Sequence, residues 1–334
     1  MRKLLFFSIF LLSITACQRD GNPVVAFYYW KTVFKLSAIE KQTLRENEVK
    51  KLYIRYFDID LNLKSQAPFP RTPIHFNEST IGFEVVPVVY IKNSVMLDKS
   101  IDILDLAQKT YDYIDQINKK NSISVSEIQI DCDWTLLSRE NYLKFLDRFK
   151  EVSRKKLSAT IRLHQIKYFK KTKIPNVDKG VLMYYNMGKI APDSLNSIYD
   201  RKIANAYLES LKRYPLPINI ALPIYSWALH IRDGKVIGLK NKIDFNSVKK
   251  DTNFVQIKEN WYKVKHSNYK KGSFFIKDDF LKQEAISRSN LLEMAEDLEQ
   301  HMGSKPDEII FYDLDEFNIS KYEKDIFKKI IGWF

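Results

Sequence analysis

The sequence has 334 residues, of which 45% are hydrophobic and 13% aromatic, and this composition predicts a compact globular protein and excludes a disordered chain. The net charge of +13 arises from cations scattered in short pairs such as Lys119-Lys120, without a basic motif or an aromatic RNA-binding signature, which argues against a nucleic-acid partner. A diffuse positive field near an anionic membrane or an acidic glycan is expected instead.

The first 16 residues predict a secretory signal peptide, because two cations at positions 2 and 3 precede an apolar run over 4–12 that is too short to span a membrane. The end of this segment and the residue after it, ITAC at 14–17, resemble the lipobox of bacterial lipoproteins. The resemblance implies a lipid on Cys17, a short tether over 17–23, a membrane partner and a place in the bacterial cell envelope, with the outer membrane favoured. An ordinary signal peptide cut near Ala16 is the alternative.

Cys17 and Cys132 are the only two cysteines. If Cys17 carries lipid, no internal disulfide can form, so the fold must be held by its own core. Cys132 is most simply a small buried hydrophobic residue. The remaining chain, 24–334, is long enough for one large domain or two small ones.

Eight short β-rich runs recur along the chain, several of them about 30 residues apart, which is the size of a βα unit. They are VVAFYYW (24–30), LYIRYFDI (52–59), EVVPVVYI (84–91), EIQIDCDW (127–134), LSATIRL (157–163), GVLMYYN (180–186), PINIALPIY (217–225) and EIIFYDLD (308–315). Helical patterns separate most of them, over 38–50, 99–118, 139–155, 197–213, 280–301 and 320–332. Ser37 and Glu40 form a capping-box sequence before the first of these helices.

Strands that alternate with helices predict an α/β fold, and eight of them predict a (β/α)8 TIM barrel. The gap between the seventh and eighth runs, about 226–306, is too long for one connection, and Asp233-Gly234 within it predicts a hairpin. A small β insertion over the barrel mouth is therefore expected. A doubly wound open sheet is the alternative, but the first run is not followed by its glycine-rich phosphate loop.

In a (β/α)8 barrel the chemistry gathers at the C-terminal ends of the strands. The residues at those ends are mainly aromatic or charged: Tyr29, Trp30, Arg55, Asp58, Asp60, Tyr90, Asp131, Asp133, Trp134, Arg162, His164, Gln165, Tyr185, Asn186, Tyr225, Trp227, Asp313, Asp315 and Glu316. Aromatic rings stack on the apolar faces of sugars, while carboxylates and amides take the hydroxyl groups. The pattern predicts a cleft for a glycan or oligosaccharide. The expected substrate-binding residues are Trp30, Arg55, Asp58, Trp134, Arg162, His164, Gln165, Tyr185, Asn186, Tyr225 and Trp227.

Several of these residues have a purely structural alternative. Asp131 and Asp133 would line the wet face of an antiparallel edge strand, or one of them would pair with a nearby arginine. His164 would serve in packing, and Trp30 and Trp227 would be core residues. The acids at the end of the second run would cap a loop.

Metal and nucleophile chemistry find no support in the sequence. The five histidines show no pair or spacing typical of metal ligands, and neither a G-x-S-x-G elbow nor a Walker loop is present. We therefore expect neither a metal nor a cofactor.

Two stretches resemble motifs of family-18 chitinases and related glycoside hydrolases. DCDWT at 131–135 is similar to their D-x-D-x-E signature on the fourth strand, and MYYN at 183–186 is similar to M-x-Y-[DN] on the sixth. The resemblance places Asp133 where the family has the aspartate that orients the substrate's N-acetyl group, and Tyr185 and Asn186 in the sixth-strand polar pair. Thr135 stands where the family carries its general acid, and a threonine cannot deliver the proton.

The chain as a whole resembles a group of uncharacterised bacterial lipoproteins with glycoside-hydrolase-like barrels, on IQIDCDWT, SATIRLHQ, MYYNMG and ALPIYSW. If the protein hydrolyses a glycan, we expect Asp133 to be the general acid, with its pKa raised by repulsion from Asp131. Asp315, Glu316 or an acid at the end of the second run would be the base or nucleophile. A non-catalytic glycan-binding lipoprotein, which Thr135 favours, is one alternative. An envelope-assembly lipoprotein that docks through the 226–306 insertion is the other.

Overall fold

A closed barrel of eight parallel strands forms the centre of the protein. The computed structural model describes residues 21–334, so the predicted signal peptide and Cys17 lie outside the described residues. The barrel strands follow the order β1-β18-β10-β9-β8-β7-β6-β3, and β3 closes the ring on β1. They are β1 (Val24–Tyr29), β3 (Lys51–Leu61), β6 (Glu84–Ile91), β7 (Glu127–Asp131), β8 (Lys156–Arg162), β9 (Lys179–Met183), β10 (Ile218–Pro223) and β18 (Glu308–Tyr312). The predicted (β/α)8 barrel is confirmed, and the open sheet is excluded.

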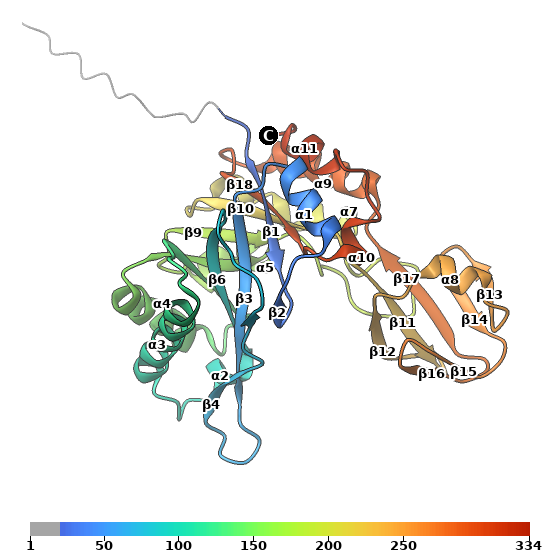
Figure 1. Ribbon diagram of the computed structural model, residues 1–334, viewed down its shortest axis with the longest axis horizontal. Helices are drawn as coiled ribbons and strands as arrows, with labels where there is room; N and C mark the ends of the chain where they lie inside the picture. Colours follow the sequence, from blue (N-terminus) through green and yellow to red (C-terminus); the bar gives the residue numbers. More distant parts are fainter. Residues whose placement is uncertain (1–20) are drawn as a thin grey trace, which may run out of the picture.

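Helices surround the barrel, with α3 and α4 packed side by side along one flank (Figure 1). The helices are α1 (Ala38–Glu46), α2 (Asn93–Leu97), α3 (Ile103–Asn121), α4 (Arg139–Ser153), α5 (Leu163–Lys167), α6 (Phe169–Thr172), α7 (Arg201–Leu208), α9 (Arg288–His301), α10 (Glu316–Ile319) and α11 (Ile326–Ile331), with a 3-10 turn at Leu211–Arg213. The connection from β3 to β6 has no helix. It contains β4 (Pro68–Arg71), which extends the sheet outside the ring, and β5 (His75–Phe76), which pairs with β2 (Val33–Phe34).

Helix starts follow local side-chain chemistry. Ser37 Oγ accepts a hydrogen bond from the Glu40 backbone N–H at 3.2 Å, and the Glu40 carboxylate accepts one from the Ser37 N–H at 2.9 Å. The predicted capping box is therefore present at the start of α1. The helix predicted over 280–301 begins later, at Arg288, because residues 280–285 pair as a strand and Ser287 caps the helix.

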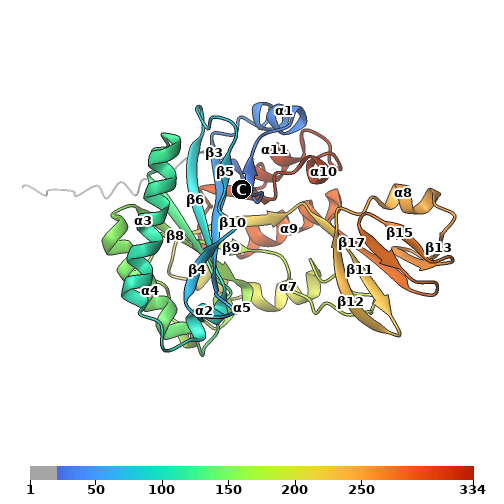
Figure 2. The same ribbon diagram turned by 60° about the horizontal axis from the view of Figure 1, so that its bottom comes forward.

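The β insertion between β10 and β18 folds as a separate five-stranded antiparallel sheet that projects from one side of the barrel (Figure 2). Its strands are β12 (Lys235–Asn241), β11 (Ser226–Arg232), β17 (Phe280–Ala285), β14 (Trp261–Val264) and β13 (Phe254–Lys258), with α8 (Phe245–Lys250) and the hairpin β15 (Asn268–Lys270) and β16 (Ser273–Phe275). Asp233 and Gly234 have φ angles of 47° and 70° between β11 and β12, as a two-residue hairpin turn requires. The insertion buries its own hydrophobic cluster, distinct from the barrel core.

Polar layers fill the lower barrel. At the N-terminal end, Lys51 and Lys179 each contact both Glu127 and Glu308 at 2.9–3.2 Å. One layer higher, Tyr28 donates a hydrogen bond to Gln129 at 2.7 Å. These layers close the bottom of the barrel interior.

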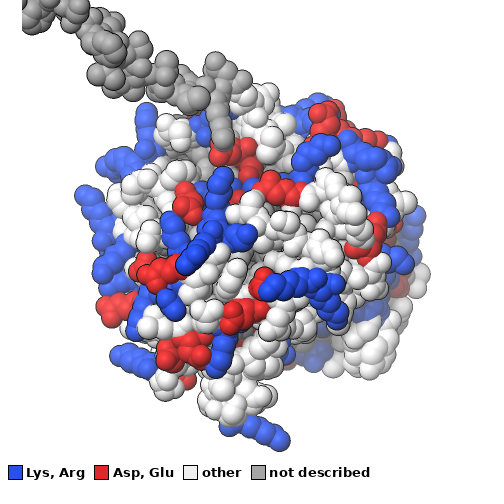
Figure 3. Space-filling view, turned by 60° about the vertical axis from the view of Figure 1, so that its left-hand side comes forward, with Lys and Arg blue, Asp and Glu red and all other residues white. Residues whose placement is uncertain are grey.

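The surface carries both signs of charge. Figure 3 shows one face on which Lys and Arg side chains are interspersed with Asp and Glu, without a continuous basic patch. Within residues 21–334, no helix has the length and apolarity to cross a membrane.

Candidate functional site

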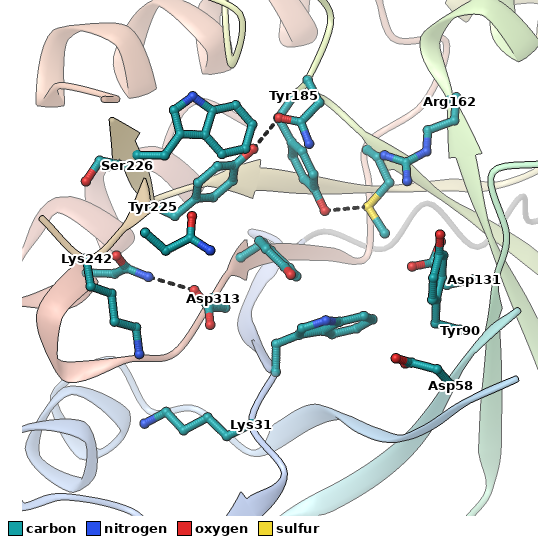
Figure 4. A pocket seen from close by; sticks show the side chains of 17 residues that line it. Lys31, Asp58, Tyr90, Asp131, Arg162, Tyr185, Tyr225, Ser226, Lys242 and Asp313 are labelled. Atoms are coloured by element: carbon teal, nitrogen blue, oxygen red, sulfur yellow. Dashed lines mark hydrogen bonds between the residues drawn. The ribbon is translucent and has the colours of Figure 1, made fainter. Parts of the chain in front are cut away.

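A cleft of about 480 Å³ opens at the C-terminal ends of the barrel strands (Figure 4). Its lining comes from all eight barrel strands or the residues that follow them, from the insertion and from α10. The lining residues are Trp30, Lys31, Asp58, Tyr90, Asp131, Arg162, Met183, Tyr185, Asn186, Tyr225, Ser226, Trp227, Asn241, Lys242, Tyr312, Asp313 and Asn318.

Aromatic rings form the floor and one wall of the cleft. The Tyr312 ring stacks on Tyr185 with centroids 5.5 Å apart, and Trp30 and Tyr225 meet it edge-on at 5.5 and 5.7 Å. Trp227 continues the row beyond Tyr225, at 5.3 Å. Such a row offers both ring faces and ring edges, which suits the apolar faces of pyranose rings.

Two carboxylates, from β7 and from β3 on the two sides of β6, share the opposite wall, where Figure 4 shows Asp131, Asp58 and Tyr90 together. β7 lies between β6 and β8, which excludes an edge strand, and Asp131 points into the barrel, where it accepts a hydrogen bond from Thr160 at 2.6 Å. Burial raises the pKa of Asp131, although the positive charge of Arg162 acts in the opposite direction. Asp58 is held by the Arg55 guanidinium through contacts of 2.7 and 2.8 Å.

Asp133 lies at the rim rather than in the main cleft. It forms an ion pair with Arg162 and is 48% exposed. Asp133, Arg162 and His164 border a smaller hollow of about 360 Å³, which shares Tyr185 and Asn186 with the main cleft. Partial burial and the charge of Arg162 lower the pKa of His164. The two hollows make one continuous surface on either side of Arg162.

Asp313 stands on the wall opposite Asp131, where the chain leaves β18. The Asn318 side chain donates a hydrogen bond to its Oδ1 at 2.6 Å. Burial, followed by repulsion from Asp315, raises the pKa of Asp313 to about 6, against the opposing effects of Lys242, the Asn318 hydrogen bond and Lys31. A carboxyl group with such a pKa can hold its proton at mildly acidic pH and release it near neutrality.

The insertion supplies part of the cleft and is fixed to the barrel by a buried carboxylate. Glu284 on β17 accepts hydrogen bonds from the indole N–H of Trp227, from Ser197 Oγ and from Lys282 Nζ. Glu284 and Lys282 are 1% and 3% exposed. The orientation of Trp227 in the cleft therefore depends on an ion pair within the inserted sheet.

Five of the residues predicted from the sequence as site residues border neither the main cleft nor the smaller hollow, in contrast to the prediction. Trp134 is 1% exposed and stacks on Tyr142 of α4, because β-strand alternation turns it toward the helices. Gln165 is buried at the start of α5, where its side chain accepts the Arg162 N–H. Arg55 supports Asp58 from behind.

The other two of these five residues are the acids that follow β18 and Leu314. Asp315 caps α10 and forms ion pairs with Lys31 and Lys242 at 3.3 and 2.8 Å, which leaves it beneath the cleft. Glu316 is exposed on α10, where its backbone N–H bonds to Glu40. Asp313, two residues before Asp315, is the acid of this segment that lines the cleft.

Several residues of the cleft were not predicted as site residues. Tyr90 and Asp313 stand among the strand-end residues of the sequence without an assigned role, and Tyr312 is the last residue of β18. Asn241 and Lys242 come from the insertion, and no local pattern places them beside the barrel mouth. Within residues 21–334, no group of three His, Cys, Asp or Glu side chains could hold a metal ion.

The comparison with solved structures identifies the fold. Neither a protein-family model nor a curated protein matches the sequence. The spore cortex-lytic enzyme SleL of Bacillus cereus is similar with a TM-score of 0.56 and 14% identity, over 94% of this chain and 75% of that one. A chitinase from Bacteroides thetaiotaomicron gives 0.56 at 9% identity, over 93% and 97% of the two chains. The GH18 chitinase of Cycas revoluta with (GlcNAc)3 gives 0.53 at 13%, over 92% and 98%. The fold is therefore that of the family-18 chitinase barrel.

Proposed function

We propose that the protein binds an oligosaccharide containing N-acetylglucosamine in the aromatic cleft. The observation that carries the proposal is the row Trp30, Tyr312, Tyr225 and Trp227, which faces carboxylates across one opening. Rings of this kind stack on sugars, while the polar groups on the facing wall can bond hydroxyl and acetamido groups. The (GlcNAc)3 bound to the Cycas revoluta chitinase supports this choice of sugar.

Within this proposal, the polar residues of the cleft have separate roles. Asp131, Arg162 and Asn186 would bond the polar groups of the sugar, and Asp133 and His164 would extend the surface for a longer glycan. Thr135 is exposed, and its backbone N–H bonds to Ser138 Oγ. It cannot replace the acid that family-18 enzymes carry at the matching position, so binding does not by itself imply hydrolysis.

The test is calorimetric binding of N-acetylglucosamine oligosaccharides to the full-length chain, with cello-oligosaccharides, which lack the acetamido group, as the reference. Trp227→Ala should weaken binding by about tenfold or more, because a stacking face is lost. Trp333→Ala is the matched control, since Trp333 is 46% exposed and lies outside the cleft. Absence of binding by the wild type, or equal affinity for both sugar series, would contradict the proposal.

We further propose that the protein is anchored in the bacterial cell envelope by a lipid on Cys17. The support is the lipobox-like sequence at 14–17, followed by only six residues before the barrel begins at Val24. Cys17→Ala should move the protein from the membrane fraction to the soluble fraction of the producing cells. An unchanged distribution would show that Cys17 does not carry the anchor.

A further inference from the structure

The wall formed by Asp313 differs chemically from the wall that faces it. Asn318 engages Oδ1 of Asp313, while Oδ2 has no hydrogen-bond or ion-pair partner among residues 21–334. Lys31 and Lys242, which line the same cleft, do not pair with it, because both contact Asp315 instead. One oxygen of a half-buried carboxyl group is therefore free toward the cleft.

Charged and titratable groups from several elements surround Asp313 and act on its pKa or interact with its charge. Asp315 raises its pKa, and Lys242 and Lys31 lower it. Lys321, Tyr225 and Tyr312 interact electrostatically with it as well. The balance leaves the pKa at about 6, in the range in which a carboxyl group can deliver a proton.

Asp58, on the facing wall, is held in place by an ion pair. Asp58 receives both arms of the Arg55 guanidinium, and Arg55 is itself fixed by hydrogen bonds to Thr72. Asp131 on the same wall is buried and accepts a hydrogen bond from Thr160, while Arg162 pairs with Asp133 at the rim. The cleft thus places Asp313, with one free carboxyl oxygen, opposite the oriented, ion-paired carboxylate of Asp58. Two carboxyl groups that flank the scissile bond are what most glycoside hydrolases use.

We propose that the cleft hydrolyses the glycan it binds, with Asp313 as the general acid and Asp58 as the base. The inference rests on the proposed function, because it needs a sugar between the two walls. It assigns the general acid to the end of β18. The resemblance at 131–135 and the prediction for Asp133 both place the general acid after β7 instead.

The reaction can be written with its atoms balanced. Asp313 gives its proton to the bridging oxygen as the bond from that oxygen to C1 breaks. A water oxygen bonds to C1, and the proton that the water loses passes to Asp58. Solvent then takes the proton from Asp58 and returns one to Asp313. The net reaction breaks one glycosidic bond and consumes one water molecule. It forms a new reducing end on one sugar and a free hydroxyl group on the other.

The experiment measures binding and cleavage separately on the full-length chain. A tetrasaccharide of N-acetylglucosamine and an aryl glycoside of the same sugar are given to the wild type and to Asp313→Asn, which keeps the hydrogen bond from Asn318. The variant should bind the tetrasaccharide within about twofold of the wild type and cleave it at least about 100-fold more slowly. It should lose much less activity on the aryl glycoside, whose phenolate leaves without a proton. Asp112→Asn, at an exposed position on α3, is the control.

The outcomes separate this inference from the proposed function. Binding by the wild type without cleavage would overturn the inference alone, and so would full activity of Asp313→Asn. Absence of binding would overturn the proposed function together with the inference. Loss of binding by Asp313→Asn would identify a binding residue and also count against the catalytic role.

The dependence of cleavage on pH gives a second readout. Because the acid must be protonated, hydrolysis should fall as the pH rises through about 6. Lys242→Met removes a cation that lowers the pKa of Asp313, so the fall should move to higher pH. A fall that stays at the same pH in this variant would contradict the assignment.

Discussion

At the scale of single residues, side-chain direction at the strand ends decides which candidates belong to the site. After β7 the chain turns Asp131 into the cleft and Trp134 into the helix layer, where it stacks on Tyr142. The alternation of a strand already puts these two residues on opposite faces. The charge of Asp131 and the aromatic ring of Trp134 suggest a shared role in the site. The two-residue period of a strand predicts the directions of these side chains correctly.

The raised pKa of Asp313 predicts a pH-dependent stability that does not depend on any ligand. The folded chain retains this proton up to about pH 6, whereas the unfolded chain releases it near 4. Stability is therefore lost as the pH rises through this window, by at most about 3 kcal/mol and by less where solvent in the cleft reaches the carboxyl group. Asp313→Asn cannot titrate and should lack this loss. Urea unfolding of both proteins at pH 4 and pH 8 tests it, and parallel pH profiles would refute it.

At the scale of elements, the sequence predicts the barrel strands well and their ends less well. The run predicted over 84–91 matches β6, whereas the runs over 127–134, 180–186 and 308–315 continue past β7, β9 and β18. The extra residues alternate as a strand does, but they leave the sheet to line the cleft or to pack beneath it. The strand pattern thus extends into the functional residues without marking the boundary.

Strand β17 lies in a segment that the sequence predicts to be helical, and this error has a different cause. FLKQEA has no β-branched residue and is rich in helix formers, so its local preference is helical. Pairing with β11 on one side and β14 on the other overrides this preference. The partners lie 16 or more residues away, so only the folded insertion reveals the strand.

The buried pair on β17 predicts how firmly the insertion is held. Glu284→Gln removes the charge that faces Lys282, and breaking such a buried pair costs about 3–5 kcal/mol. Urea unfolding should show this loss, and Lys282→Met in the same chain should recover part of it. Asp278→Asn breaks the exposed pair with Lys263 and should leave stability unchanged. Equal effects of the two acid substitutions would show that burial of the pair is not what matters.

At the scale of the whole molecule, the barrel and the insertion divide the cleft between them. Ser226 and Ala285 are register partners where the insertion leaves and re-enters the barrel. The two ends therefore lie next to each other, and the insertion has its own hydrophobic cluster. The barrel core does not depend on the insertion for closure, whereas the cleft does.

This division predicts the effect of removing the insertion. Ser226 can be joined to Ala285 through Asn-Gly, a sequence suited to a two-residue turn. The shortened chain should keep a cooperative unfolding transition, because the barrel ring remains closed. It should bind N-acetylglucosamine oligosaccharides at least about tenfold more weakly, since Trp227, Asn241 and Lys242 are lost from the cleft. Unchanged affinity in calorimetry would mean that the insertion serves another purpose, such as docking of an envelope partner.

The end at which the chain enters the barrel determines which end of the barrel a lipid anchor would hold near a membrane. Residue 24 starts β1 at the closed end, and the cleft opens at the other end. Six peptide links from Cys17 to Pro23 reach at most about 20 Å when fully extended. A lipid at Cys17 would therefore hold the closed end near the bilayer and turn the cleft outward. The accessible sugars are then those of polymers in the space beyond the membrane, while a sugar on a lipid carrier would lie behind the barrel, out of reach.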